Sequence, residues 1–241
     1  MAMQSGALTP QEYALIRAVQ GYSYREQVRI DQKRSVRRIG FKKQEPVKLT
    51  PADARGLKNQ PATPQGRRDR LLMCLLLDHG LRVGEVTGLA VGDLNLEEGV
   101  LRFYRPKVNK EQVHRLTDDT LAAATACQTH GEFVTAGLLL RRSMKNEELG
   151  TAGMTARAVT ARVRLLGERL GIAGLSAHDC RHYWATSAAR HGTDPFVLQE
   201  AGGWSSLAMP RRYVEENNIA NEGVRLGQGE KRGKERQNGE K

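Results

Sequence analysis

The most informative segment of this 241-residue chain is GGWSSLAMPRRY, which spans Gly202–Tyr213. It holds a glycine pair, a tryptophan and a late tyrosine. Pro195 predicts a short helix that ends at about Ala201, and Ser206 predicts the start of another helix that carries Tyr213. Taken alone, Tyr213 is better explained as a core aromatic, so its meaning depends on the motifs that precede it.

A second motif, LSAHDCRH at Leu175–His182, combines a helix start with two groups that bind phosphate. Ser176 and Asp179 have the spacing of a capping box, which predicts a helix that begins there and runs to about residue 190. His178 and Arg181 are three residues apart and share one face of that helix. An imidazole and a guanidinium on one face suit a phosphate oxygen. A polar, solvent-facing helix start explains the same residues without any ligand.

A zinc site is a rival interpretation of this motif. His178 and His182 have the i, i+4 spacing that zinc-binding helices use, and Cys180 lies between them. Cys180 is expected on a different face of the helix, however, and the charge of Arg181 would repel the metal. Because no further Cys/His cluster lies nearby in the sequence, we expect no metal site.

A third motif, GLRVGE at Gly80–Glu85, follows an apolar run. Leu81 and Val83 are expected to be buried, so Arg82 between them must be paired. Glu85 at i+3 is placed to orient it. A structural Arg–Glu pair without a ligand is an equally good explanation.

The hydrophobic pattern predicts a mainly α protein with one small antiparallel β-sheet, an α+β fold. Strands are expected at residues 100–104 and 112–116, joined by a turn at 107–111 that contains Lys107, a place where a lysine is usually just exposed. Helix starts are expected at Thr50 and Thr63, and helices at residues 65–78, 83–89, 118–129 and 154–170. The helix at 65–78 is expected to bury one face, formed by Leu71, Leu72, Leu75 and Leu76.

The chain is strongly basic, with a net charge of +11. Residues 25–48 hold nine basic and three acidic side chains, which is +6 within 24 residues. Such a concentration favours contact with a polyanion, most commonly nucleic acid, over a role in solubility alone. We expect this basic arm to bind DNA through Arg25, Arg29, Lys33, Arg34, Arg37, Arg38, Lys42 and Lys43.

Composition argues against membrane and secreted classes of protein. The longest apolar run, Leu71–Leu77, has seven residues and is far too short to span a bilayer, and the N-terminus has no secretory pattern. Cys74, Cys127 and Cys180 are widely spaced and odd in number, which indicates reduced thiols rather than a disulfide framework. We therefore expect a cytoplasmic protein without a membrane partner.

Taken together, the motifs resemble the tyrosine recombinase/integrase family, which includes phage integrases, Xer-type recombinases and Cre-like enzymes. The matching strings are DHGLRVGEV at residues 78–86, LSAHDCRH at 175–182, and the Gly-Gly-Trp of residues 202–204 followed nine residues later by Tyr213. Lys107 lies between them at the hairpin turn. Each motif is weak by itself, but four in register over about residues 47–221 are specific.

The resemblance implies the catalytic-domain fold of that family and a reaction that cleaves and rejoins DNA through a 3′-phosphotyrosyl link, without metal, ATP or another cofactor. Tyr213 would be the nucleophile, and Arg82 and Arg181 would hold the non-bridging phosphate oxygens. Lys107 would protonate the leaving 5′ oxygen, and His178 would take part in proton transfer.

The resemblance also implies roles for three neighbouring residues. Trp204 stands where many members have histidine and Cre-like members have tryptophan, and its indole N–H would donate to the phosphate. Glu85 and His182 match positions that hold the arginine and the phosphate site in place.

Organisation and partners follow from the same resemblance. We expect a remnant of the core-binding domain plus the basic linker at residues 1–46, a catalytic domain at 47–226 and a disordered tail at 227–241. The family's helical DNA clamp would thus be truncated. The expected partner is double-stranded DNA, bound in the nucleoid by a homo-oligomer that is a tetramer on two DNA sites.

Two other functions compete with a recombinase or integrase. The alternative is a truncated DNA-binding remnant that no longer recombines DNA. A type IB topoisomerase, which uses a similar set of residues, is a weaker third possibility because the extra domains usual in that class have no room in this chain.

Overall fold

The computed structural model describes residues 46–215 except residue 107. The chain divides into two units, at residues 1–45 and 46–241. The basic arm up to Lys43, the C-terminal tail and Lys107 lie outside the described residues. The domain boundaries at 46/47 and 226/227 stay predictions.

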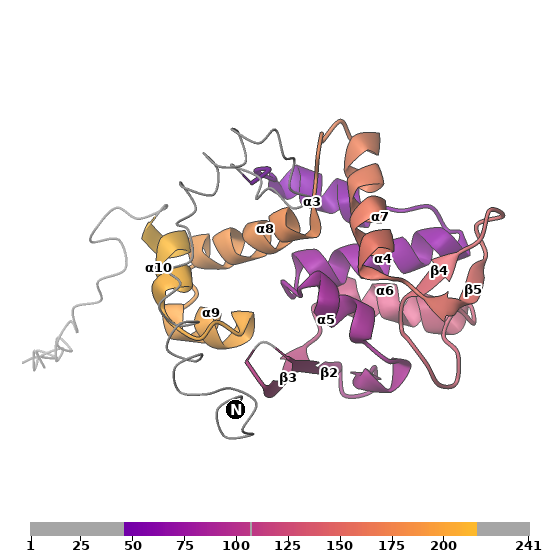
Figure 1. Cartoon of the computed structure of the whole chain (residues 1–241), viewed down its shortest axis with the longest axis horizontal. Helices are drawn as coiled ribbons and strands as arrows, with labels where there is room; N and C mark the ends of the chain where they lie inside the picture. The colour runs from indigo at the N-terminus through magenta and orange to yellow at the C-terminus, as the bar shows by residue number, and fades with distance from the viewer. Residues whose placement is uncertain (1–45, 107, 216–241) are drawn as a thin grey trace, which may run out of the picture. The chain divides into compact units, whose positions relative to one another are not determined.

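The described residues form a mainly helical fold with two small antiparallel sheets, so the predicted α+β class is confirmed (Figure 1). The helices are α3 (Pro51–Lys58), α4 (Pro64–Leu77), α5 (Val83–Gly88), α6 (Asp118–Thr129), α7 (Ala156–Arg169), α8 (Ala177–Arg190), α9 (Pro195–Gly202) and α10 (Ala208–Glu215). The first sheet has the order β1 (Leu94–Asn95), β2 (Val100–Arg105), β3 (Lys110–Arg115), after the 3-10 turn η1 (Val91–Asp93); the second pairs β4 (Arg141–Ser143) with β5 (Leu149–Gly153). In the part of the chain that the structure describes, no helix is long and apolar enough to cross a membrane.

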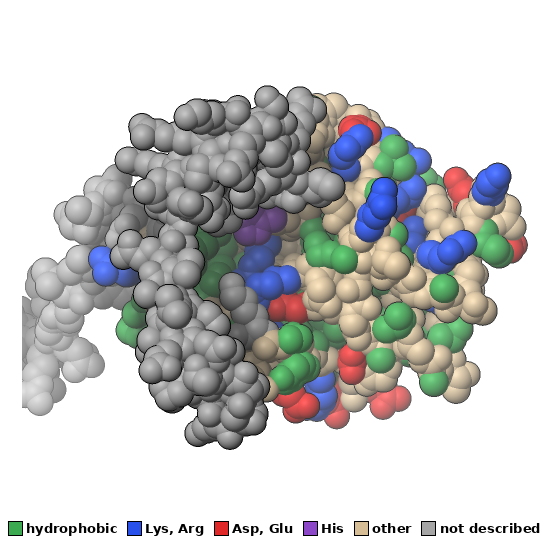
Figure 2. Space-filling model, viewed as in Figure 1, with side chains coloured by type: hydrophobic (Ala, Val, Ile, Leu, Met, Phe, Trp, Pro, Cys, Tyr) green, Lys and Arg blue, Asp and Glu red, His purple; other side chains and the backbone are tan. Residues whose placement is uncertain are grey.

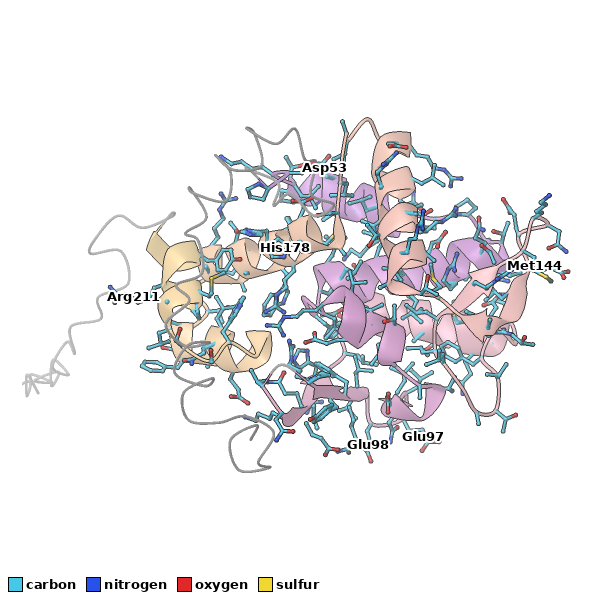
Figure 3. The ribbon with its side chains drawn as sticks, viewed as in Figure 1. Asp53, Glu97, Glu98, Met144, His178 and Arg211 are labelled. Carbon is cyan, nitrogen blue, oxygen red and sulfur yellow. The ribbon has the colours of Figure 1, made fainter. Side chains whose placement is uncertain are left out.

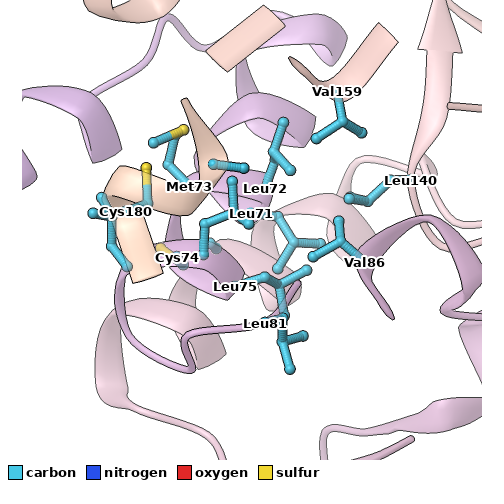
Figure 4. Close-up of a cluster of buried hydrophobic side chains, with 14 of the residues drawn as sticks. Leu71, Leu72, Met73, Cys74, Leu75, Leu81, Val86, Leu140, Val159 and Cys180 are labelled. Carbon is cyan, nitrogen blue, oxygen red and sulfur yellow. The ribbon is translucent and has the colours of Figure 1, made fainter. Parts of the chain in front are cut away.

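Helix α4 supplies the centre of the hydrophobic core (Figure 4). Every residue from Leu71 to Leu76 is 0% exposed, because α3, α6 and α8 pack against this helix. The expectation of a single buried face on α4 is too narrow, since Met73 and Cys74 are buried as well. The second half of the helix, Leu71–Leu77, is enclosed by its neighbours and is apolar all round, whereas its first half carries charged residues.

The predicted hairpin is present, with a shorter turn than expected. β2 pairs with β3 in a register that places Arg105 opposite Lys110, so β2 runs one residue further than predicted and β3 begins within the segment predicted as a turn. Alternate residues of β2 point inward, which buries Leu101, Phe103 and Arg105. β1 and the β4–β5 hairpin are not predicted from the sequence, because they are short and show no regular alternation of apolar and polar residues.

The predicted capping box at the start of α8 is confirmed. The Ser176 side chain accepts a hydrogen bond from the Asp179 backbone, and the Asp179 carboxylate accepts one from the Ser176 N–H at 2.8 Å. The other oxygen of this buried carboxylate accepts from the backbone N–H of Val47 at 2.9 Å. Asp179 therefore fixes both the first turn of α8 and the chain segment that enters the described unit.

His79, which is buried just after α4, meets the half-buried His114 of β3. The rings of His79 and His114 stack with centroids 5.7 Å apart, and His79 Nε2 lies 3.1 Å from Thr120 Oγ1. Burial lowers the pKa of His79 to about 4. Burial, together with repulsion from His79 and from the cations Arg105 and Arg181, lowers the pKa of His114 to about 3. Both imidazoles are therefore neutral in the folded protein at neutral pH.

We expect the free energy of unfolding to fall as the pH drops below about 6.5, because the unfolded chain then binds protons that the folded protein does not. Each histidine should account for a loss of roughly 2 kcal/mol at pH 5 relative to pH 7.5. Urea unfolding at the two pH values measures this difference. The double variant H79Q/H114Q should show a smaller change, and an equal change would assign the acid sensitivity to other groups.

Candidate active site

Arg181 lies on the inner side of α8 rather than in solvent. It is 4% exposed, and two of its donors bind main-chain oxygens: Nη1 binds Gly80 at 2.5 Å and Nη2 binds Gly202 at 2.6 Å. Gly80 belongs to the loop between α4 and α5, and Gly202 ends α9. One guanidinium therefore joins all three sequence motifs, and the interpretation of Arg181 as a solvent-facing residue is wrong.

Two tryptophans lie against this guanidinium. Arg181 Cζ is 4.6 Å from the ring centroid of Trp204 and 5.8 Å from that of Trp184. A Cβ atom on Gly80 would lie 2.3 Å from the Trp184 ring, so the glycine permits this close approach. Trp184 is not singled out by the motifs, although its position three residues after Arg181 on one helix was an available signal.

Tyr213 lies on α10 and is 2% exposed. Its ring meets His182 edge-on with centroids 5.2 Å apart and lies beside Trp204 at 5.9 Å. His182 in turn meets the exposed His178 edge-on at 4.9 Å. Tyr213 is thus as buried as a core aromatic, but its ring neighbours are the predicted site residues.

Arg82 is oriented by Glu85, as their spacing predicts. Arg82 Nη1 donates to Glu85 Oε1 at 2.7 Å, and the Arg82 backbone N–H donates to Oε2 at 2.7 Å. Nη2 donates to the carbonyl of Gly203 at 3.2 Å. The Arg82 side chain is 27% exposed, which leaves part of it accessible to a ligand. Of the two flanking residues, Leu81 is buried as expected, whereas Val83 is only half-buried.

A third arginine, Arg105 at the end of β2, shares partners with the other two. Its Nη1 donates to both Glu85 carboxylate oxygens at 3.2 Å and to the Gly202 carbonyl at 3.0 Å, and its Nη2 donates to the Ala201 carbonyl at 2.8 Å. None of the sequence motifs includes Arg105. The available signal was its inward place in the alternating pattern of β2.

These three guanidinium groups lie around one buried carboxylate, that of Glu85. Burial lowers the pKa of Arg181 to about 9, with further lowering from the charges of Arg82 and Arg105, while Glu85 opposes the shift. Burial also lowers the pKa of Arg105 to about 10. Excess positive charge in a poorly solvated place favours an anionic ligand. A negative charge on Tyr213 would raise the pKa of Arg181, so the same interaction would stabilise a phenolate.

The zinc alternative does not fit the placement of Cys180. Its side chain lies in the hydrophobic core, where burial raises the pKa of the thiol, whereas the His182 ring faces Tyr213. Among residues 46–215 other than 107, no group of three or more His, Cys, Asp or Glu side chains is placed to hold a metal ion.

The structure brings most of the predicted site residues together. Figure 3 labels His178 on α8 and Arg211 on α10, the helices that carry the histidines and the tyrosine. In Figure 2, a histidine side chain lies next to basic and acidic side chains on one face. The residues that meet are Arg82, Glu85, His178, Arg181, His182, Trp204 and Tyr213. Lys107 and the basic arm lie outside the described residues, so their placement stays a prediction.

Comparison with known families matches residues 48–219 to the phage integrase family. The chain belongs to this family. It is 30% identical over 199 residues to tyrosine recombinase XerD of Yersinia pestis, an alignment that covers 80% of this chain and 66% of the relative. It is 34% identical over 154 residues to tyrosine recombinase XerC of Pelobacter propionicus, with 62% of this chain and 48% of the relative covered. The chain thus spans about half to two thirds of the length of the curated relatives it matches.

Solved structures of recombinases share the fold of this chain. The crystal structure of XerA recombinase superposes with a TM-score of 0.60 at 20% identity, covering 90% of this chain and 75% of that one. The XerH recombinase bound to palindromic difH substrate, in a post-cleavage complex, gives a TM-score of 0.57 at 20% identity, covering 72% of this chain and 50% of that one. The chain therefore has the tyrosine recombinase catalytic-domain fold.

Proposed function

We propose that this chain is the catalytic part of a site-specific DNA recombinase or integrase. In the proposed reaction the Tyr213 hydroxyl loses its proton and attacks a DNA phosphorus atom. A new O–P bond forms to the 3′ phosphate, and the bond to the 5′ oxygen breaks as that oxygen takes up a proton. The 3′-phosphotyrosyl link keeps the energy of the phosphodiester, so a 5′ hydroxyl can reverse the step without ATP.

One arrangement carries the proposal: the candidate nucleophile and a phosphate-binding cation are neighbours across a single indole. The Trp204 ring lies 5.9 Å from the Tyr213 ring and 4.6 Å from Arg181 Cζ. An aromatic residue with a merely structural role does not require a buried guanidinium beside it. The pairing is what a tyrosine that attacks phosphorus needs.

The two arginines would stabilise the transition state more than the ground state. The pentacoordinate phosphorus species has more negative charge on its non-bridging oxygens than the phosphodiester has, so Arg82 and Arg181 bind it more strongly. Main-chain carbonyls and Glu85 already hold both guanidinium groups in place. Little reorganisation is therefore needed during the reaction.

The remaining site residues have proposed roles in proton transfer and phosphate contact. His182 contacts the rings of both Tyr213 and His178. We therefore assign to the two histidines the transfer of the Tyr213 proton toward solvent. Lys107 would protonate the 5′ oxygen. The Trp204 indole N–H would donate to the phosphate, which an indole can do without titrating.

The wider assembly is also part of the proposal. The basic arm at residues 25–48 would add phosphate contacts along the duplex. Strand exchange would use a homo-tetramer on two DNA sites, with residues 47–226 as the catalytic domain, acting in the cytoplasm on the nucleoid. The Tn1549 transposon integrase, which was solved in complex with a circular intermediate DNA, supports DNA as the partner, and we propose that the DNA is double-stranded.

A covalent-capture assay tests the proposal. The chain is incubated with a library of nicked duplexes in which the short 5′-hydroxyl strand is lost after cleavage, so that religation cannot occur. The expected result is a protein–DNA adduct that survives denaturant, with mass spectrometry placing the nucleotide on Tyr213. Binding of the library without any adduct would contradict a recombinase and favour the DNA-binding remnant.

A further inference from the structure

We infer that Arg105 is a positioning residue that sets the geometry of Arg82 and Arg181. The chemical consequence rests on the proposed function, whereas the contacts stand independently of it. Arg105 is 0% exposed, and a buried guanidinium is unfavourable unless its donors are paired. Its partners come from β3, α5 and the end of α9, so the side chain joins three elements.

Two partners of Arg105 are shared with the arginines proposed to hold phosphate. Glu85 accepts a hydrogen bond from Arg82 at 2.7 Å and from Arg105 at 3.2 Å. The Gly202 carbonyl accepts from Arg181 at 2.6 Å and from Arg105 at 3.0 Å. Arg105 therefore links Arg82 and Arg181 through one carboxylate and one carbonyl, and a displacement of Arg105 would disturb both.

The backbone between these contacts is also shaped by Arg105. Gly203 has a φ of 57° and lies in the left-handed region that favours glycine. A Cβ atom on Gly203 would lie 2.5 Å from Arg105 Cδ. The Gly203 carbonyl accepts from Arg82. The Arg105 side chain thus packs directly against the residue that positions Arg82.

The β2–β3 hairpin is held to α9 by the same group. Arg105 Nε donates to Gln112 on β3, and Gln112 Nε2 donates to the Glu200 carbonyl at 2.5 Å. Together with the Ala201 and Gly202 contacts, this anchors three successive carbonyls at the C-terminal end of α9. The peptide segment that leads to Trp204 therefore has a fixed path.

A positioning role and a purely structural role predict different results. If Arg105 served only stability, its replacement by methionine would lower the free energy of unfolding, because Glu85 and two carbonyls lose a donor, but the folded protein would cleave DNA at the wild-type rate. If it positions the two arginines, the fold persists but the guanidinium groups lose their alignment. A misplacement of about 1 Å is enough to slow catalysis about 100-fold.

The test compares Arg105→Met and Arg105→Lys with a matched control, Arg102→Met. Arg102 lies on the same strand, has a side chain 60% exposed and pairs with Glu98 at the surface. We expect the single-turnover cleavage rate of Arg105→Met to fall about 100-fold with DNA affinity nearly unchanged. Arg105→Lys keeps the positive charge but loses the forked guanidinium donor. Its cleavage rate should therefore lie between the rates of Arg105→Met and the wild type. Arg102→Met should cleave like the wild type.

A modified substrate identifies the groups through which Arg105 acts. A methylphosphonate at the scissile position lacks one charged non-bridging oxygen, so its reaction depends less on the two arginines. On this substrate the single-turnover cleavage rate of Arg105→Met should be within about threefold of the wild-type rate. A defect of equal size on both substrates would overturn the inference. A cleavage defect that is relieved only by a substrate with sulfur in place of the 5′ oxygen would also overturn it. Sulfur leaves without protonation, so that result would place the defect in the proton donor and not in the two arginines.

Amide hydrogen exchange keeps this inference separate from the proposed function. If the wild type forms no adduct, the function proposal fails, and exchange still decides the role of Arg105. In Arg105→Met we expect exchange at least about tenfold faster at residues 82–86 and 202–204, with residues 71–76 as protected as in the wild type. Unchanged exchange at residues 202–204 would overturn the inference.

Discussion

Tyr213→Phe should eliminate the covalent protein–DNA adduct while DNA binding persists. The substitution removes the phenolic oxygen, which is the attacking atom of the proposed step, and keeps the ring that contacts His182 and Trp204. We expect adduct formation to fall by at least about 10⁴-fold, which is the scale seen when a nucleophile is removed. Covalent capture on the selected duplex measures the adduct, and a mobility-shift titration measures binding.

The matched control for this variant is Tyr183→Phe on α8. Tyr183 is half-buried and packs against the hydrophobic core, so its hydroxyl can be removed without touching the proposed chemistry. Both variants should stay within about 1 kcal/mol of the wild type in free energy of unfolding. An undiminished adduct in Tyr213→Phe would assign the attack to another residue.

Arg181→Lys should reduce the cleavage rate by about 10³-fold, although the positive charge is retained. The guanidinium binds the carbonyls of Gly80 and Gly202 in two directions. The ammonium group of a lysine cannot donate to both carbonyls and to a phosphate oxygen at the same time. The loss should appear in the single-turnover rate constant more than in DNA affinity, because the contact matters most in the transition state.

Arg190→Lys provides the comparison for Arg181→Lys. Arg190 ends the same helix and is exposed, so its replacement should leave the rate constant unchanged. If Arg181→Lys cleaved as fast as Arg190→Lys, the phosphate-binding role of Arg181 would be excluded.

The features that the sequence predicted correctly depend on local physics. The capping pair at Ser176 and Asp179 and the i, i+3 pair of Arg82 and Glu85 are formed by residues three apart, and both are present. The hairpin and the amphipathic helices follow from short-range periodicity. The meeting of the three motifs was anticipated by the family resemblance rather than by any local pattern.

The features that were missed depend on contacts between distant segments. Arg105 reads as an ordinary strand residue until Glu85 and the end of α9 are brought against it. The spacing of Trp184 from Arg181 places the two on one helix face, but it does not reveal that the loop at Gly80 packs against the Trp184 ring. The burial of Met73 and Cys74 requires neighbours on every side of α4. The hydrophobic periodicity of one segment does not indicate which distant segments will pack against it.

The arginines of this site are bound largely by main-chain oxygens. The carbonyls of Gly80, Ala201, Gly202 and Gly203 together receive donors from Arg82, Arg105 and Arg181. A carbonyl is present whatever side chain a residue has, so sequence drift at Ala201 would leave these bonds available. The glycines are different, because added atoms at Gly80, Gly202 or Gly203 would collide with Trp184, Trp204 or Arg105. Selection at this site would therefore act on the absence of side chains as strongly as on the identity of the charged ones.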